Sequence, residues 1–191
     1  MTSRLIAGLA LTALVTACNE SPRAPANDAA TASTEHPADP VASAEAAAPA
    51  SIAKGAAIVT MDAAGTMTTL RAGNNGWTCM PNNPATPGPD PMCMDANAMK
   101  WAAAWIAHKP PPADNVGLMY MLAGGSDASN TDPWGQKPAG DGKWVETGPH
   151  VMVVGSASLN ALYPSGDNPD TTKPYVMFGG TPYAHVMMPV K

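Results

Sequence analysis

Residues 115–134 and 148–154, NVGLMYMLAGGSDASNTDPW and GPHVMVV, decide the expected fold of this chain. In the first segment, apolar side chains alternate along residues 116–122, which is the two-residue period of a β-strand with one buried face. Two glycines then end the strand, and six polar residues crowd into positions 126–132. The second segment predicts another strand over residues 150–154. Because consecutive strands are usually neighbours in a sheet, we expect this pair to carry the polar loop at one end.

The polar loop is the first candidate for a ligand-binding site. An apolar strand that delivers several hydrogen-bonding side chains to one edge of a sheet is a common way to build such a site. His150 opens the following strand, so we expect its imidazole to lie within reach of Ser126 and Asp127. The candidate binding residues are Ser126, Asp127, Asn130, Asp132 and His150.

Other interpretations of the loop remain open. A hydrolase using Ser126 or Ser129 with His150 and an aspartate would need these side chains in contact. The sequence contains no GxSxG, HExxH, GxGxxG or P-loop signature to support one. The carboxylate and amide oxygens of the loop suit a hard cation such as Ca²⁺, but the spacing of an EF-hand is missing. We favour a turn in which the side chains bond their own backbone over a calcium site.

Methionine is the unusual feature of the composition, with thirteen residues against a single Phe. The triplet His-Val-Met occurs twice, at residues 150–152 and 185–187. Along a strand, residues i and i+2 face the same side, so neighbouring strands would bring two imidazoles and two thioethers together. Such soft ligands suit copper, above all Cu(I). The candidate metal ligands are His150, Met152, His185 and Met187.

Packing is the alternative explanation for the methionines. Methionine is a flexible and polarizable core residue, and here it would replace Phe and Leu. This explanation also covers Met61, Met67, Met119 and Met177, which the metal site does not need. We favour packing and keep copper binding as an alternative function.

The remaining apolar runs complete the expected fold. Asp95 caps the first helix, and three consecutive prolines after His108 end it. The element order β-β-α-β-β-α-β-β predicts an α+β fold with a mostly antiparallel sheet of about six strands and two helices packed on one face. The expected strands are residues 56–61, 66–70, 116–122, 150–154, 175–178 and 184–188, and the expected helices are residues 96–108 and 158–163.

Two of the three cysteines flank a proline-rich segment. Five prolines lie between Cys79 and Cys93 and forbid regular structure there. In an exported chain these two cysteines are expected to pair as a disulfide, which would stabilise the fold by about 3 kcal/mol. A thiolate metal or redox site is the alternative, but the spacing is not CxxC and no His lies between them.

The N-terminus predicts export. Arg4 precedes an apolar core over residues 5–15, which is too short to span a membrane comfortably. The segment ends in VTAC, residues 15–18, which resembles a bacterial lipobox; an ordinary cleavable signal with an incidental Cys18 is the alternative. The lipobox resemblance implies that Cys18 carries the lipid that holds the protein at a membrane. Asn at position 19, in place of the Asp that favours inner-membrane retention, implies the outer membrane, with the domain facing the periplasm or the cell surface.

The expected organisation has three parts: a lipoprotein signal peptide (1–17), a tether (18–53) and a single globular α+β domain (54–191). The tether is rich in Ala, Pro, Ser and Thr and has few large apolar side chains, so we expect it to be disordered. Because Ala has the highest helix propensity, short helical fragments over residues 41–48 remain an option. The domain carries eight Lys and Arg against ten Asp and Glu without a basic stripe, so nucleic acid is not an expected partner.

Five segments of the domain resemble a family of uncharacterised secreted bacterial proteins. They are WTCMP, DPMCMDANAMKW, GGSDASNTDP, TGPHVM and KPYVMFGGTPYAHVMMPV. The resemblance covers the chain from Gly73 onward and implies an exported domain, but it brings no activity. Taken with the residues above, the sequence predicts a lipid-anchored domain that binds a small ligand or a partner, with copper binding or a Ser/His hydrolase as alternatives.

Overall fold

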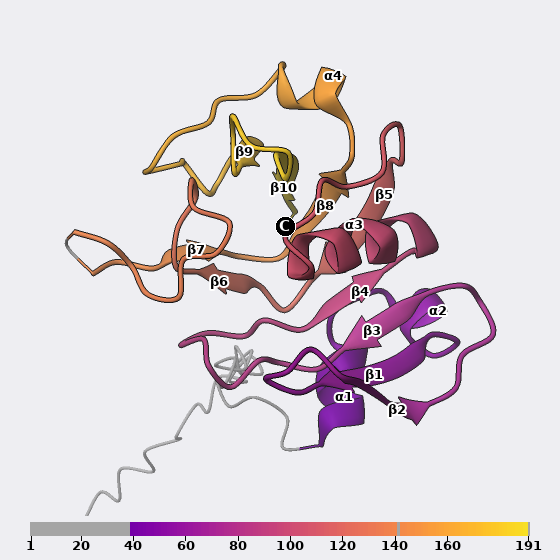
Figure 1. The fold of residues 1–191 in the computed structure, drawn as a ribbon. Helices are drawn as coiled ribbons and strands as arrows, with labels where there is room; N and C mark the ends of the chain where they lie inside the picture. The colour runs from indigo at the N-terminus through magenta and orange to yellow at the C-terminus, as the bar shows by residue number, and fades with distance from the viewer. Residues whose placement is uncertain (1–38, 141, 191) are drawn as a thin grey trace, which may run out of the picture. The chain divides into compact units, whose positions relative to one another are not determined.

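The computed structural model describes residues 39–140 and 142–190, which belong to one compact unit, Thr34–Lys191. The predicted signal peptide, the lipidation residue Cys18 and the first part of the predicted tether lie outside the described residues. Within them, a large sheet with helices on both faces forms an α+β fold (Figure 1). No helix of the described part of the chain is long and apolar enough to cross a membrane.

The main sheet has eight strands in the order β2-β1-β3-β4-β5-β8-β10-β9. All neighbours are antiparallel except β1 and β3, which are parallel. The predicted class and the mostly antiparallel sheet are therefore confirmed, but the sheet is larger than the six strands expected. The strands are β1 Ala57–Met61, β2 Met67–Arg71, β3 Thr78–Met80, β4 Met92–Met94, β5 Gly117–Met121, β8 His150–Val154, β9 Tyr175–Met177 and β10 His185–Pro189. A separate two-stranded sheet joins β6 Gly125–Asp127 to β7 Val145–Thr147.

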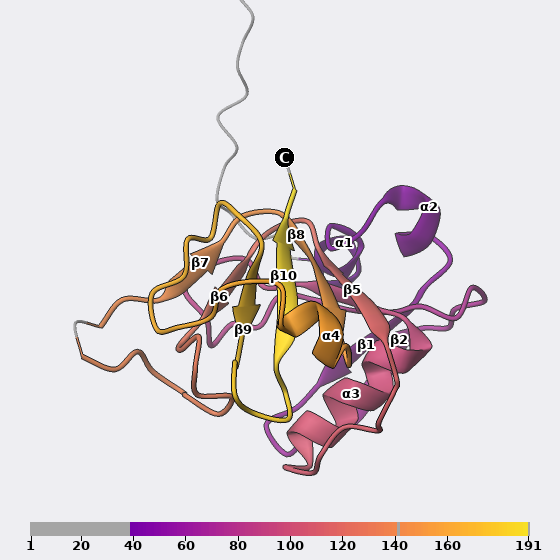
Figure 2. The same ribbon diagram turned by 90° about the horizontal axis from the view of Figure 1, so that it is seen from above.

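Four helices accompany the sheet in the described residues: α1 Pro40–Glu45, α2 Ala50–Ala53, α3 Ala96–Ile106 and α4 Ala157–Asn160. Asp95 caps α3 as predicted, because its side chain accepts hydrogen bonds from the backbone N–H groups of Asn97 and Ala98. Figure 2 shows α3 on one side of the sheet and α1 and α2 on the other. The expectation of helices on one face is wrong, because both faces of the sheet are apolar and each needs a cover.

The face under α3 is a core rich in methionine. Met94, Met119, Met152 and Met187 are buried there together with Trp101 of α3. Gly117 lets the helix approach β5 closely: a Cβ atom at this position would lie 2.3 Å from the backbone nitrogen of Ala98. The opposite face packs on α4 through the buried side chains of Val153, Val176 and Val186 and the half-buried Leu159.

Residues 40–53, which the sequence assigns to the tether, are folded as α1 and α2. Ala44, Ala47 and Ala53 are buried against Ile58 and the two cysteines. This part of the disorder prediction is wrong, because small side chains can pack closely on a flat sheet without presenting the large apolar residues that usually indicate a core. The folded domain therefore begins before Lys54.

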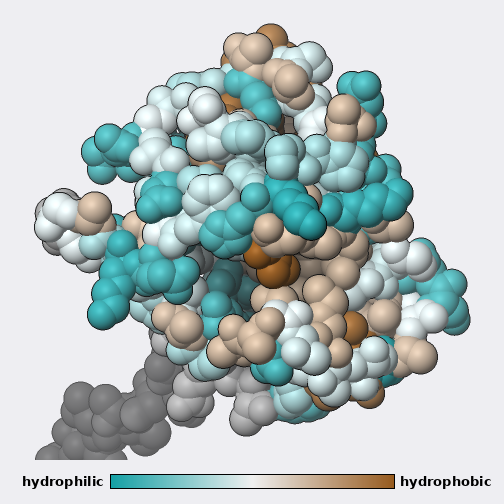
Figure 3. All heavy atoms as spheres, in the orientation of Figure 1, coloured by the Kyte–Doolittle hydropathy of each residue, from teal (hydrophilic) through white to brown (hydrophobic). Residues whose placement is uncertain are grey.

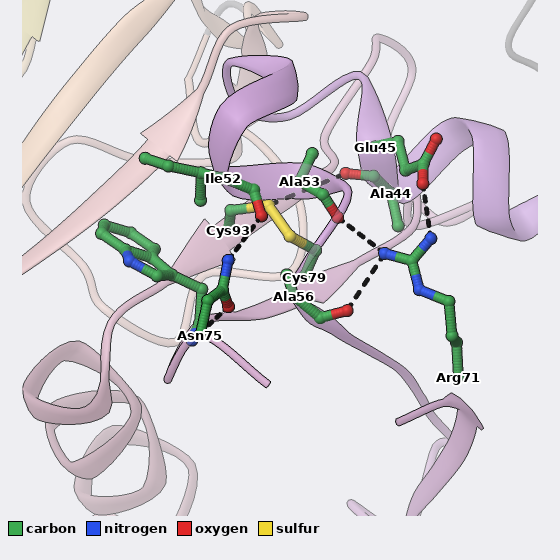
Figure 4. Close-up of a disulfide and its surroundings, with 10 residues drawn as sticks. Ala44, Glu45, Ile52, Ala53, Ala56, Arg71, Asn75, Cys79 and Cys93 are labelled. Atoms are coloured by element: carbon green, nitrogen blue, oxygen red, sulfur yellow. Dashed lines mark hydrogen bonds and ion pairs between the residues drawn. A yellow bond between two sulfur atoms is a disulfide. The ribbon is translucent and has the colours of Figure 1, made fainter. Parts of the chain in front are cut away.

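An arginine joins these helices to the sheet. Arg71 of β2 forms an ion pair with Glu45, which also pairs with Lys54. The same guanidinium donates to the backbone oxygens of Ala53 at 2.6 Å and Ala56 at 3.0 Å. Figure 4 shows this network beside the disulfide. Together these contacts satisfy carbonyl groups that the end of a short helix leaves unpaired.

The predicted disulfide between Cys79 and Cys93 is confirmed. The two residues are direct partners in the antiparallel pair β3–β4, with Cα atoms 4.0 Å apart. The proline-rich segment between them is a loop, except that Met80 and Met92 continue the pairing by one step. The disulfide thus lies inside the sheet and closes the loop at its base.

Candidate functional site

A pocket with a volume of about 320 Å³ opens between the proline-rich loop and the polar loop that follows β6. Figure 3 shows the surface hollowed between the end of α3 and β6, with strongly hydrophilic atoms recessed beside hydrophobic ones. Such a volume accommodates a small molecule. Four aromatic and three acidic residues line the pocket: Trp105, Trp134, Trp144, Phe178, Asp90, Asp127 and Asp132.

Asp90 comes from the proline-rich loop and is half-buried in the pocket. The pKa of its carboxyl group is raised to about 8, chiefly by burial and in addition by the negative charge of Asp127. A hydrogen bond from Thr86, 3.3 Å long, acts in the opposite direction. The backbone N–H of Asp90 donates to the side-chain oxygen of Asn82 at 2.6 Å, and this bond holds the loop in place at Asp90.

Asp127, at the end of β6, is the second carboxyl of the pocket. Burial raises its pKa to about 7. Among the described residues, no hydrogen bond or ion pair to its carboxylate is found, and burial is the cause of the shift. At pH 7.5 the two carboxyls therefore hold about one negative charge between them.

The aromatic walls are held by their own contacts. Trp105 donates from its indole nitrogen to the backbone oxygen of Pro133 at 2.9 Å. Trp134 stacks on His108, with ring centroids 4.5 Å apart, and meets the edge of Tyr183 at 5.3 Å. Rings fixed in this way can receive a ligand without first losing rotamer entropy.

The other predicted loop residues brace the loop. Ser129 accepts hydrogen bonds from the backbone nitrogens of Thr131 and Asp132, at 3.1 and 2.9 Å, and Asp132 accepts one from Trp134. Asn130 is buried and donates to the backbone oxygens of Gly166 at 2.6 Å and of Val176 at 3.1 Å. The turn interpretation thus describes Ser129 and Asp132, whereas Asn130 bonds backbone groups far along the chain and Asp127 lines the pocket without such a bond.

His150 lies where the strand pairing predicts, opposite Met121 at the last step of β5–β8. Its Nδ1 lies 2.7 Å from the backbone oxygen of Gly148, and its buried Nε2 has no hydrogen-bond partner. His150 therefore donates no hydrogen bond to Ser126 or Asp127, although all three lie near the start of β6. The Ser–His arrangement that a hydrolase would need is not formed among the described residues.

The four predicted metal ligands share the methionine-rich face of the sheet. Met152 of β8 is the direct partner of Met187 of β10, and His150 pairs with Pro189. His185 lies farther along β10, between the rings of Trp101 at 5.1 Å and Phe178 at 5.4 Å. Burial lowers the pKa of His150 and lowers that of His185 to about 4, so both rings are neutral at pH 7. No group of three or more His, Cys, Asp and Glu side chains gathers for a metal ion in the described chain.

Sequence reasoning missed half of the pocket. Asp90, Trp105, Trp144 and Phe178 come from segments away from the polar loop, and no local pattern links them to it, whereas Trp134 directly follows the loop. The expected disulfide was the available signal, because closing the loop at Cys79 and Cys93 restricts where the segment between them can lie. In comparisons with known proteins, no family model, no curated protein and no solved structure matches this chain.

Proposed function

We propose that this protein is an exported, lipid-anchored binding protein whose pocket takes a small organic cation with an ammonium group. One observation carries the proposal: the charged side chains among the described lining residues are all aspartates, and they lie beside four aromatic rings. A cation is attracted by the faces of aromatic rings and by the carboxylates. The lipid anchor at Cys18 and the position at the outer membrane belong to the proposal and rest on the sequence.

The two raised pKa values support a cationic ligand. Asp90 and Asp127 are difficult to ionise together, because both are partly buried and their charges repel. A bound ammonium group would stabilise the ionised forms and would release protons on binding. A neutral ligand such as a sugar would also stack on the aromatic rings, but it would not relieve this repulsion.

The test compares choline with 3,3-dimethylbutan-1-ol, in which a carbon atom replaces the charged nitrogen. Titration calorimetry at pH 7.5 should detect choline and should find at least about tenfold weaker binding of the neutral alcohol. Asp127→Asn should weaken choline binding by about tenfold or more, because a charge-assisted contact is lost. Asp114→Asn serves as the matched control, since Asp114 is exposed and does not line the pocket.

Equal binding of choline and its neutral analogue would contradict the proposal. Binding of neither probe, nor of spermidine and tetramethylammonium as larger and smaller cations, would contradict it as well. Loss of choline binding in Asp127→Asn counts only if circular dichroism shows the native fold. Asp114→Asn removes the same charge outside the pocket. If it leaves choline binding unchanged, the loss in Asp127→Asn comes from the pocket and not from the net charge.

A further inference from the structure

One imidazole nitrogen in the methionine-rich core has no partner. His150 is fully buried, at 0% exposure, and its Nε2 accepts and donates no hydrogen bond. Because the backbone oxygen of Gly148 can only accept, Nδ1 must carry the proton and donate to it. In the neutral ring, Nε2 then presents a bare lone pair, which is the form of imidazole that binds metal ions.

Two methionines neighbour His150 on this face of the sheet. Met121 is the cross-strand partner of His150, and Met152 follows two residues along β8 on the same face. A Cβ atom built on Gly125 would lie 3.0 Å from Met121 Cε and 3.7 Å from His150 Nε2. The methyl end of Met121 and the imidazole ring of His150 therefore both border the space at Gly125, which contributes no side chain, and the nearest ring atom there is Cε1, at 3.1 Å.

We propose that this cluster is a second binding site, which holds one Cu(I) ion through His150 Nε2 and the thioether sulfurs of Met121 and Met152. Imidazole nitrogen and thioether sulfur are soft neutral ligands that suit Cu(I), whereas hard cations require oxygen ligands. Cu(I) carries a single charge, so burial costs it less than it costs a divalent ion. The site is separate from the aspartate pocket and uses none of its side chains.

The strand register defines which histidine takes part. His185 lies four residues before Pro189, the direct partner of His150, which places the two histidine Cα atoms about 13 Å apart along the strand direction. His185 also packs between Trp101 and Phe178. The proposed ligand set therefore takes His150 and Met152 from the two His-Val-Met triplets and adds Met121 from the neighbouring strand.

Core packing explains why the methionines are buried, but it does not explain why His150 Nε2 has no hydrogen-bond partner. A buried polar atom without a partner costs free energy, and native proteins rarely retain one without a reason. Gly125 of β6 lies against the ring of His150, and β6 and β7 have three residues each and pair only with one another. A two-stranded sheet of this length opens readily, so the ion can enter without unfolding the main sheet.

The experiment uses the full chain carrying Cys18→Ser, so that no chain that escaped lipidation offers a free Cys18 thiol to the metal. Ag(I), a mimic of Cu(I) that needs no reductant, keeps the disulfide intact during native mass spectrometry and calorimetry. Anaerobic Cu(I) titration against bicinchoninate then gives the affinity. The substitutions Met121→Leu and Met152→Leu remove sulfur at nearly constant volume. Met177→Leu is the matched control, since Met177 is buried in the same core on β9.

We expect one equivalent of Ag(I) or Cu(I) per chain. The double variant Met121→Leu with Met152→Leu should bind at least about tenfold more weakly, while Met177→Leu should bind as the parent does. His150→Asn should abolish metal binding. Asn is chosen because its side-chain amide can still donate a hydrogen bond to the backbone oxygen of Gly148. X-ray absorption of the Cu(I) form should show a shell of mixed nitrogen and sulfur. Unchanged binding in the double variant, or no bound equivalent in the parent chain, would overturn the proposal. Neither result bears on choline binding, which is measured separately.

Discussion

Burial and, after it, the negative charge of Asp127 raise the pKa of Asp90, although the two carboxyls come from segments that lie on either side of α3 in the sequence. The disulfide at the base of one loop and β6 at the start of the other bring them to the same pocket. When both carboxyls are ionised they repel each other, and a cation bound between them would reduce this repulsion.

Cation binding should depend on pH. Tetramethylammonium keeps its charge at every pH, so any dependence of its affinity reports on the protein. Because the pKa of Asp127 is about 7, its ionised fraction increases about tenfold between pH 6 and pH 8, and we expect a similar increase in affinity. Calorimetry in two buffers of different ionisation enthalpy should show proton release near pH 7. A flat pH profile would mean that this carboxylate does not contact the cation.

Asp127→Asn should stabilise the protein at high pH. The pKa of Asp127 is about 7 in the fold against 3.8 for the free side chain, so the folded state binds the extra proton and stability falls as pH rises through this range. At pH 8 the variant should be more stable than the parent by about 1–3 kcal/mol, and at pH 4 the two should differ little. Urea unfolding at both pH values measures the difference, with Asp114→Asn as the control for net charge.

A charge at position 44 should destabilise the domain, because α1 is part of it. Ala44 is fully buried, whereas Ala42, on the same helix, is exposed. Ala44→Asp should therefore cost about 2–4 kcal/mol in urea unfolding, and Ala42→Asp less than about 0.5 kcal/mol. Equal effects of the two substitutions would restore the interpretation of these residues as a disordered tether.

Removal of the disulfide should lower stability. Replacing both Cys79 and Cys93 with Ala should reduce the free energy of unfolding by about 3 kcal/mol, since the closed loop no longer restricts the unfolded chain. Chemical denaturation of the variant and the parent provides the measurement. The parent protein, unfolded without a reductant, should show no titratable thiol from this pair; two free thiols would contradict the bond.

The lipid anchor can be tested by fractionation. Cys18→Ser should move the protein from the membrane fraction to the soluble exported fraction, and the mass of the mature chain should lack the acyl groups. The Cys79→Ala and Cys93→Ala variant retains Cys18 and should stay in the membrane fraction. An unchanged distribution and mass for Cys18→Ser would reject the lipobox prediction.

The sequence predicted that the longer elements exist, but not always which face they bury: Val116 and Leu118 are exposed, whereas Met119 and Met121 are buried. All six expected strands correspond to strands of the main sheet, and α3 begins at the residue that Asp95 caps. The strands β3, β4, β6 and β7, of three residues each, were missed, whereas β9, which is equally short, was predicted. A segment so short has no measurable period, and its pairing depends on partners elsewhere in the chain.

The candidate site was predicted in part. The predicted pairing of the two strands is found, and it brings the ring of His150 next to Gly125, but the imidazole bonds Gly148 and not Ser126 or Asp127. Asn130 illustrates the same limit: its amide bonds Gly166 and Val176, which no spacing in the sequence connects with it. Asp127 lines the pocket as a loop carboxylate should, whereas Asp90 required the folded chain to be recognised.

The position of β10 has a consequence for the order of folding. This strand is the last of the described chain, yet it lies inside the main sheet, between β8 and β9. Until residues 185–189 have been synthesised, β8 has one bare edge and β9 has no strand to pair with in the main sheet. The methionine-rich core would likewise stay open to water on that side, so a nascent chain can complete this half of the sheet only after residues 185–189 have left the ribosome.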